Sequence, residues 1–122
     1  MLVDDDEAIV ETLREVLEAE GYRVEAFTDP IPALERLRAG TRADVVVLDC
    51  VMPSMHGGQF MEALAREGRM IPIVLVTALS DPGFCVDIRH PLAAALINKP
   101  FDLDQLLETL EEVCARRRAR AA

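Results

Sequence analysis

The sequence predicts an α/β protein with a doubly wound, five-stranded parallel sheet and helices on both faces. Short apolar runs alternate with amphipathic segments along the 122 residues, which is typical of successive strand–helix units. Two of the runs, residues 45–48 and 71–77, are almost entirely apolar, as expected for strands that are covered on both faces. Because crossovers between parallel strands are right-handed, five such units favour the strand order 2-1-3-4-5.

The boundaries of these elements follow from the apolar periodicity and from residues that begin or end helices. The strands are predicted at residues 1–3, 22–27, 43–48, 71–77 and 93–97. The first helix ends at Gly21, the second runs from Asp29-Pro30 to Gly40, the third covers about residues 59–67, and Asp102 begins the last. On one face this last helix is expected to bury Leu103, Leu106, Leu107, Leu110 and Val113.

Residues 80–92 form the least regular part of the predicted fold. Pro82, Gly83 and Pro91 leave room for only about two helical turns, so we expect a short or irregular fourth helix at residues 84–89. With that exception, the units match a flavodoxin-like sheet. In such a sheet, ligands bind at the carboxyl ends of the strands.

Composition restricts the classes of protein that fit. A net charge of -9 argues against direct binding of nucleic acid, because the domain would repel a phosphate backbone. The three cysteines, Cys50, Cys85 and Cys114, are widely spaced and indicate reduced thiols rather than disulfides or a metal site. The apolar runs are too short for a membrane span, and no signal peptide is recognised. We therefore expect a cytoplasmic protein that contacts no membrane.

Polar residues follow four of the predicted strands and should meet at one edge of the sheet. Asp4 and Asp5 follow the first strand, Asp49 the third, Thr77 ends the fourth and Lys99 follows the fifth. Two carboxylates on neighbouring strands about 5 Å apart would repel by about 3 kcal/mol, so a cation is expected there. Oxygen ligands favour Mg²⁺. Lys99, the only lysine, is suited to contact a phosphoryl oxygen.

The segments VDDDEAIV, VVVLDCVMPSMHGG, IVLVTAL and INKPF together resemble the receiver domain of two-component response regulators, the CheY-like family. The resemblance covers essentially the whole chain, with residues 1–115 as the receiver and 116–122 as a basic tail or the start of a linker. It implies that Asp49 is the phosphoacceptor, and that Mg²⁺ is bound by Asp4, Asp5, Asp49 and the carbonyl of Val51. Thr77 and Lys99 would contact the phosphoryl group, and Pro100 would follow a cis peptide bond.

The resemblance also implies partners and a way of working. Asp49 would take a phosphoryl group from a phosphohistidine on a sensor histidine kinase or phosphotransfer protein, so the domain would catalyse its own modification rather than turn over a substrate. The product would act as a conformational switch. An output domain would lie outside these residues, and homodimerisation stays open.

Two residues depart from the family pattern. Leu96 stands where an aromatic side chain usually follows Thr77 in the switch, and His56 stands where aspartate is common; we interpret His56 as a loop residue that points away from the metal site. Leu96 and the irregular segment favour an alternative, a receiver-like docking module that acts without phosphorylation. A third interpretation, a phosphohydrolase of the haloacid dehalogenase kind, requires an aspartate at the position of Val51.

Overall fold

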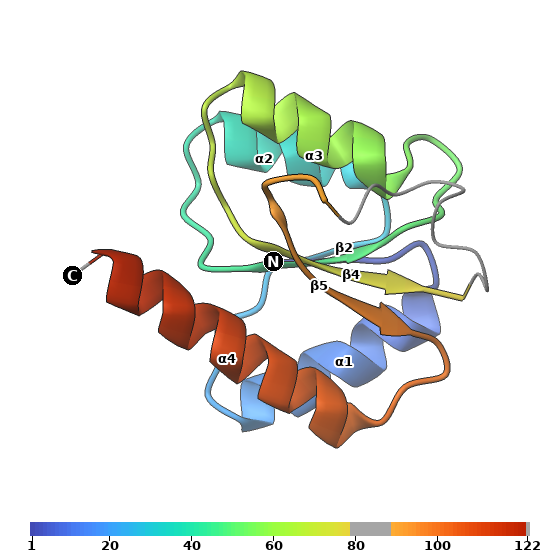
Figure 1. Ribbon diagram of the computed structural model, residues 1–122. Coiled ribbons are helices and arrows are strands. Elements are labelled where there is room, and N and C mark those ends of the chain that lie inside the picture. Colours follow the sequence, from blue (N-terminus) through green and yellow to red (C-terminus); the bar gives the residue numbers. More distant parts are fainter. Residues whose placement is uncertain (79–88, 122) are drawn as a thin grey trace.

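The computed structural model describes residues 1–78 and 89–121, which form a sheet between two layers of helices (Figure 1). The strands are β1 (Leu2–Val3), β2 (Ala26–Phe27), β3 (Val46–Asp49), β4 (Ile73–Thr77) and β5 (Ala93–Asn98). The helices in the described ranges are α1 (Glu7–Ala19), α2 (Pro30–Arg38), α3 (Gly57–Arg66) and α4 (Leu103–Ala121). All strands are parallel in the order β2-β1-β3-β4-β5, which confirms the predicted topology.

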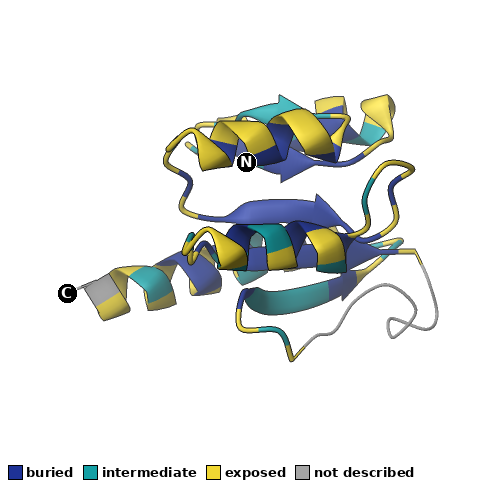
Figure 2. Cartoon of the chain, turned by 90° about the horizontal axis from the view of Figure 1, so that it is seen from above, coloured by how far each residue is buried: buried dark blue, intermediate teal, exposed yellow. Residues whose placement is uncertain are grey.

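The two faces of the sheet are covered by different helices, and each face has its own apolar cluster. Alternate residues of β3 point in opposite directions: Val46 and Leu48 pack beneath α2 and α3, and Val47 packs against α1 and α4. Figure 2 shows the strands β3 and β4 buried and the outer faces of the helices exposed. This burial on both faces accounts for the unbroken apolar runs of the sequence.

Side chains cap the amino ends of the helices, where the first N–H groups lack partners within the helix. Asp6 accepts hydrogen bonds from the N–H groups of Ala8 and Ile9 at the start of α1. Asp29 accepts from Ile31 at the start of α2. Asp102 accepts from Asp104 at the start of α4, as the sequence predicts.

Several predicted boundaries are wrong by a few residues. β2 contains Ala26 and Phe27 instead of residues 22–27, because β1 has no residues opposite the earlier part of that segment. Leu103 is exposed at the start of α4 instead of buried, and α4 continues through the arginines at residues 116–120. The predicted short helix at residues 84–89 falls almost entirely on residues 79–88, which lie outside the described residues.

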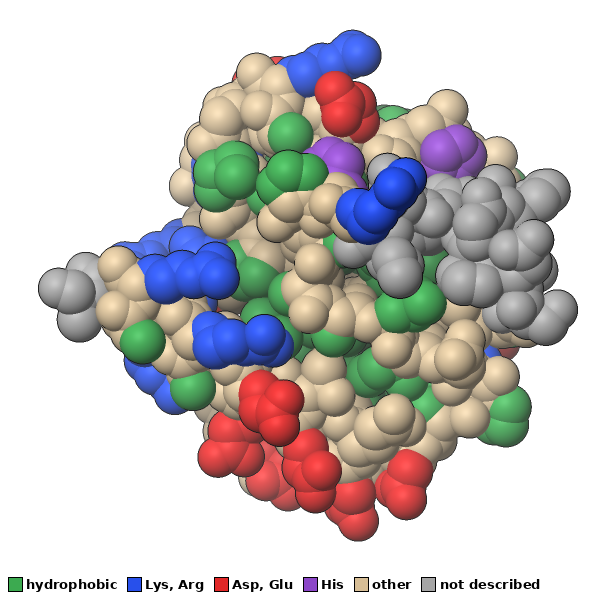
Figure 3. Space-filling view, in the orientation of Figure 1, with side chains coloured by type: hydrophobic (Ala, Val, Ile, Leu, Met, Phe, Trp, Pro, Cys, Tyr) green, Lys and Arg blue, Asp and Glu red, His purple; other side chains and the backbone are tan. Residues whose placement is uncertain are grey.

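The surface charge is unevenly distributed. In Figure 3, Lys and Arg side chains gather near the carboxyl end of α4, and acidic side chains line the lower edge of the same view. The acidic net charge therefore coexists with a basic patch at the end of α4. None of the helices in the described ranges combines the length and the apolar character needed to cross a bilayer.

Candidate functional site

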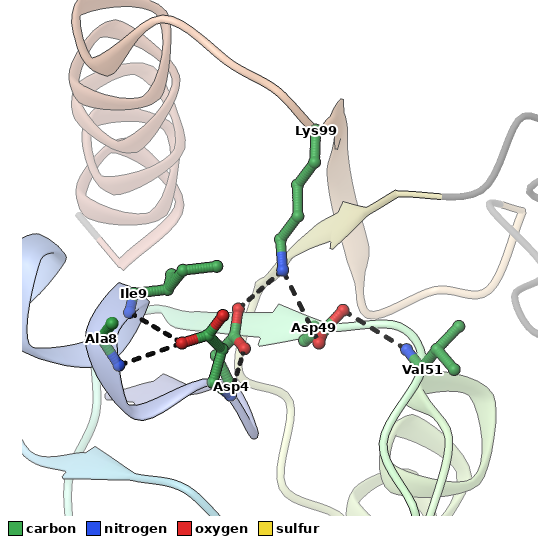
Figure 4. A network of polar contacts seen from close by, with 7 residues as sticks. Asp4, Ala8, Ile9, Asp49, Val51 and Lys99 are labelled. Carbon is green, nitrogen blue, oxygen red and sulfur yellow. Dashed lines mark hydrogen bonds and ion pairs between the residues drawn. The ribbon is translucent and has the colours of Figure 1, made fainter.

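Three charged side chains from distant parts of the sequence meet at the carboxyl edge of the sheet (Figure 4). Asp4 follows β1, Asp49 ends β3, and Lys99 follows β5. Lys99 Nζ lies 2.9 Å from Asp4 Oδ2 and 3.7 Å from Asp49 Oδ2, so one ammonium pairs with both carboxylates. All three side chains are largely buried, which strengthens their mutual attraction compared with a surface ion pair.

Asp5 completes an acidic cluster with Asp4 and Asp49. One carboxylate oxygen from each of the three lies within 4.8 Å of the others, which is close enough for all three to contact one ion. Asp5 is exposed, so it leaves the cluster open to solvent. Because hard divalent cations prefer oxygen ligands and Mg²⁺ usually retains several waters, these carboxylates fit Mg²⁺.

The electrostatics of the site are set by burial and by the crowding of like charges. Burial, together with the charge of Asp4, raises the pKa of Asp49 from 3.8 to about 6, although the charge of Lys99 opposes the change. Burial alone would lower the pKa of Lys99. The hydrogen bond to Asp4 and the charge of Asp49 outweigh burial, so the pKa of Lys99 lies above its ordinary value. The site therefore favours a charged lysine and resists further negative charge.

Thr77 and Lys99 are held together by the last rung of the sheet. Thr77 ends β4 opposite Asn98, and its carbonyl accepts a hydrogen bond of 2.7 Å from the N–H of Lys99. Thr77 is fully buried. The peptide bond between Lys99 and Pro100 is cis. Thr77, at the end of β4, and Lys99, directly after β5, therefore lie at the edge that carries the acidic cluster.

Val51 contacts Asp49 through its backbone, whereas Leu96 packs against the sheet behind the site. The N–H of Val51 donates to Asp49 Oδ1 at 3.4 Å, and its side chain is 44% exposed. The assignment of the Val51 carbonyl as a metal ligand remains a prediction. Leu96 pairs with Leu75 in the sheet and packs against the cluster beneath α2 and α3. It is two residues before the partner of Thr77, on the same face of β5 as that partner.

The role of His56 is the main feature that sequence reasoning missed. His56 Nδ1 accepts a hydrogen bond of 3.3 Å from the N–H of Gln59, and Gln59 Oε1 accepts one of 3.1 Å from the N–H of His56. This capping box begins α3 at Gly57, two residues before the predicted start. The glutamine three residues after His56 was the available signal, but histidine is not among the usual capping residues.

The loop that follows Asp49 also contacts the residue that caps α2. Ser54 Oγ donates a hydrogen bond of 3.2 Å to Asp29 Oδ1, the same carboxylate oxygen that caps α2. At Gly57, an added Cβ would lie 3.2 Å from Leu75 Cδ2 and 3.4 Å from Cys50 Cα, so the helix start packs closely on the sheet. These contacts position the loop after Asp49 from two sides.

The fold and this site define a class: doubly wound α/β proteins with an acidic cluster that could hold a metal ion and a lysine at the same edge of the sheet. A family model described as the response regulator receiver domain matches residues 1–111. The chain belongs to this family, which makes it a signalling domain of two-component regulatory systems.

Curated relatives agree with this assignment. Response regulator MprA of Mycobacterium sp. (strain KMS) is 36% identical over 116 residues, covering 95% of this chain and 50% of the relative. The phosphoglycerate transport system transcriptional regulatory protein PgtA of Salmonella typhimurium is 32% identical, covering 98% of this chain and 28% of the relative. The chain thus spans half or less of the length of these relatives.

Solved structures show the same architecture. The CheY-like response regulator receiver domain protein from Methanospirillum hungatei has a TM-score of 0.87 and 26% identity, covering 98% of this chain and 94% of the other. The chemotaxis response regulator CheY4 of Vibrio cholerae has a TM-score of 0.80 and 31% identity, covering 92% and 94%.

Proposed function

We propose that the domain is phosphorylated on Asp49 by a phosphohistidine of a sensor histidine kinase or phosphotransfer protein, and that this modification switches its signalling state. One observation carries the proposal: Lys99 Nζ is held between the carboxylates of Asp4 and Asp49 at the carboxyl edge of the sheet. An ammonium in that position is ready to neutralise oxygens of a phosphoryl group attached to Asp49.

The transfer is a substitution at phosphorus. A carboxylate oxygen of Asp49 forms the new O–P bond as the N–P bond of the phosphohistidine breaks, and the departing imidazole keeps the electron pair and takes up a proton. Asp49 acts as the ionised nucleophile. Since its pKa is about 6, the carboxylate form predominates above that pH. Lys99 and the hydroxyl of Thr77 bind the phosphoryl oxygens, and the carboxylate of Asp49 is oriented by the N–H of Val51.

The acidic cluster would hold Mg²⁺ through Asp4, Asp5 and Asp49, with the carbonyl of Val51 as a further ligand. The ion supplies positive charge that offsets the repulsion between these carboxylates and the incoming phosphoryl group. Lys99 cannot provide this alone, because its one charge already faces two carboxylates.

The switch follows from competition for Lys99. A phosphoryl group on Asp49 adds negative charge beside an ammonium that is hydrogen-bonded to Asp4 in this structure. Lys99 and Thr77 move toward the phosphoryl group, and the change passes to β5, where Leu96 takes the place of an aromatic residue. We assign residues 1–115 to the receiver domain, in agreement with the family match to residues 1–111. Residues 116–121 continue α4, so a linker to an output domain in a longer cytoplasmic protein would begin as a helix.

The test is to incubate the protein with Mg²⁺ and acetyl phosphate and to record its intact mass. We expect an increase by one phosphoryl group, which is lost in Asp49→Ala and suppressed by a chelator. Asp44→Asn is the matched control, because this exposed aspartate lies before the same strand and far from the acidic cluster. Labelling of Asp49→Ala would overturn the assignment of the acceptor. If the unmodified chain is not labelled, the result would favour the alternative of a docking module that acts without phosphorylation, which the presence of Leu96 in place of an aromatic residue also favours.

A further inference from the structure

The charges of α4 are divided between its two halves. The first half has no basic residue and carries four acids, Asp104, Glu108, Glu111 and Glu112. The second half has no acid and carries four arginines, at residues 116, 117, 118 and 120. Apart from Arg117, which is half-buried, these residues are exposed, and Figure 3 shows basic side chains gathered near the carboxyl end of the helix. The exposed face of α4 therefore has opposite charges at its two ends.

The helix dipole accounts for only part of this division. Asp104 in the first turn and Arg118 and Arg120 in the last turn have the signs of charge that the dipole favours. The effect of the dipole fades within one turn of each end, but Glu111 and Glu112 stand in the third turn of the helix. The acids in the middle of α4 therefore need another explanation.

Neighbouring charges along α4 repel one another. Glu108 has a like charge four residues away on both sides, at Asp104 and Glu112, and Arg116 has one at Arg120. Such pairs lie side by side on a helix and destabilise it slightly. Glu112 and Arg116 have the spacing of a favourable pair, but Arg116 Nε donates a hydrogen bond of 3.4 Å to the carbonyl of Glu112 instead. Within the described parts of the chain, no charged side chain of α4 forms an ion pair.

The positions of these charges match those of a second α4 that runs in the opposite direction. Glu111 and Arg118 lie on the side of the exposed face toward the end of α1. Glu112 and Arg116 lie on the other side. In an antiparallel pair related by a twofold axis, each side meets the same side of the partner. Glu111 then faces Arg118 of the second copy, and Glu112 faces Arg116. Both pairs need the same centre, close to Ala115, to within about one residue.

The strip between the two charged sides allows the helices to approach closely. Ala115 and Ala119 occupy this strip and are exposed. Their small side chains are compatible with a distance of about 8–10 Å between the helix axes, at which glutamate and arginine side chains reach the partner. A parallel pair would instead place acids against acids and arginines against arginines. The pattern on α4 therefore favours the antiparallel arrangement.

The net charge of -9 opposes the association of two copies, but it acts over a longer range. At physiological ionic strength, exposed charges more than about 8 Å apart are largely screened from each other. Side chains paired across α4 are closer than this, so their attraction persists. Added salt above this level should weaken the pairs themselves.

We propose that α4 is a surface for self-association, which pairs antiparallel with α4 of a second copy. Glu111 contacts Arg118 of that copy, Glu112 contacts Arg116, and twofold symmetry makes each contact occur twice. Because exposed ion pairs are individually weak, the dimer is weak and its population depends on concentration and salt.

Sedimentation equilibrium of the full chain at increasing concentration tests the association. Near physiological salt, we expect the weight-average mass to rise from 13.5 kDa toward the mass of a dimer, with a smaller rise at about 1 M salt. Glu111→Arg/Glu112→Arg should raise the dissociation constant by about tenfold or more. Glu11→Arg/Glu15→Arg, at exposed positions of α1, is the matched control, because it changes the net charge equally and should not weaken the dimer.

Exchange of charge tests the complementarity of the two halves. Arg116→Glu/Arg118→Glu should also be monomeric by itself, because its α4 would meet a copy with only acids at the paired positions. An equimolar mixture with Glu111→Arg/Glu112→Arg should form a mixed dimer, since an all-basic face then meets an all-acidic one. Recovery in the mixture would also show that both variants are folded.

A cross-link tests the orientation. Arg118→Lys keeps the charge and introduces an amine, which a carbodiimide joins to a carboxylate in direct contact. We expect this amine to be linked to Glu111 of the second copy, as identified by mass spectrometry of the cross-linked dimer. On the same helix these two positions are about 10 Å apart, so the link would join two copies.

Four results would overturn the proposal. A constant mass at all concentrations would exclude self-association. Equal weakening by the α1 control would assign the effect to net charge. Failure of the two α4 variants to associate when mixed would exclude charge complementarity, and a link from the introduced amine to an acid outside α4 would exclude the antiparallel pair. Acetyl phosphate labelling of Asp49 should be equal in all variants, so its failure would contradict only the proposed function.

Discussion

The two ends of β1 have different surroundings. At its carboxyl end, Asp4 is buried, with Oδ1 accepting from the N–H of Asp6 and Oδ2 from Lys99. At its amino end, the Met1 ammonium is paired with Val45, but among the described residues the N–H of Glu25 makes no backbone hydrogen bond. The comparison teaches that charged side chains occupy the carboxyl edge of this parallel sheet, whereas backbone groups meet at its amino edge.

Removing the lysine should give the largest effect and should be confined to the carboxyl edge. We expect Lys99→Met to lower the rate of acetyl phosphate labelling by about 100-fold, because the variant loses the ammonium that neutralises the phosphoryl oxygens. Rates are measured by intact mass against time at saturating Mg²⁺. Arg117→Met is the control from the amino edge, where Arg117 contacts the carbonyl of Asp44. A similar loss in both variants would contradict the separation of the two ends.

The second prediction concerns the cost of burying Asp49. Its folded pKa of about 6 exceeds the ordinary value of 3.8, so the folded state binds the extra proton between these pH values. Protonation of Asp49 therefore stabilises the folded state relative to the unfolded state. This stabilisation is complete below about pH 4 and is lost as the pH rises through 6. In chelator at pH 7.5, Asp49→Asn should therefore raise the free energy of unfolding by about 2 kcal/mol, since solvent still reaches part of the site.

Urea unfolding from pH 4 to pH 8 checks this prediction. The difference between Asp49→Asn and the unmodified chain should shrink as the pH is lowered below 6 and vanish near 4. Addition of Mg²⁺ at pH 7.5 should stabilise the unmodified chain more than the variant, because the ion offsets the charge of Asp49. A difference that is independent of pH would show that the ionisation of Asp49 is not its cause.

The smallest effect is expected at α3, the helix that follows the loop after Asp49. His56→Ala removes the acceptor for the N–H of Gln59 and should lower the free energy of unfolding by about 1 kcal/mol. His56→Asp should restore the cap, because aspartate accepts the same hydrogen bond and favours a helix amino terminus. Thermal unfolding of the two variants measures the effect. If His56→Asp is as unstable as His56→Ala, the capping role is excluded.

The sequence was sufficient to predict the strand order and the meeting of Asp4, Asp49 and Lys99, because the carboxyl ends of parallel strands share one edge. It did not predict the length of β2, since the alternation of residues 22–27 extends beyond Ala26 and Phe27, the two residues that pair with β1. Nor did it predict the cap at His56, because two glycines follow it and glycine disfavours a helix interior.

Lys99 is the only lysine among the 122 residues, which therefore carry two amines: the ε-amine of Lys99 and the α-amine of Met1. They lie at opposite ends of the sheet, one between two carboxylates and the other at the carbonyl of Val45. Reductive methylation with ¹³C-formaldehyde would thus place a single NMR reporter at each end. One spectrum could follow phosphoryl chemistry at the carboxyl edge and the surroundings of Met1 at the amino edge as two signals in the same sample.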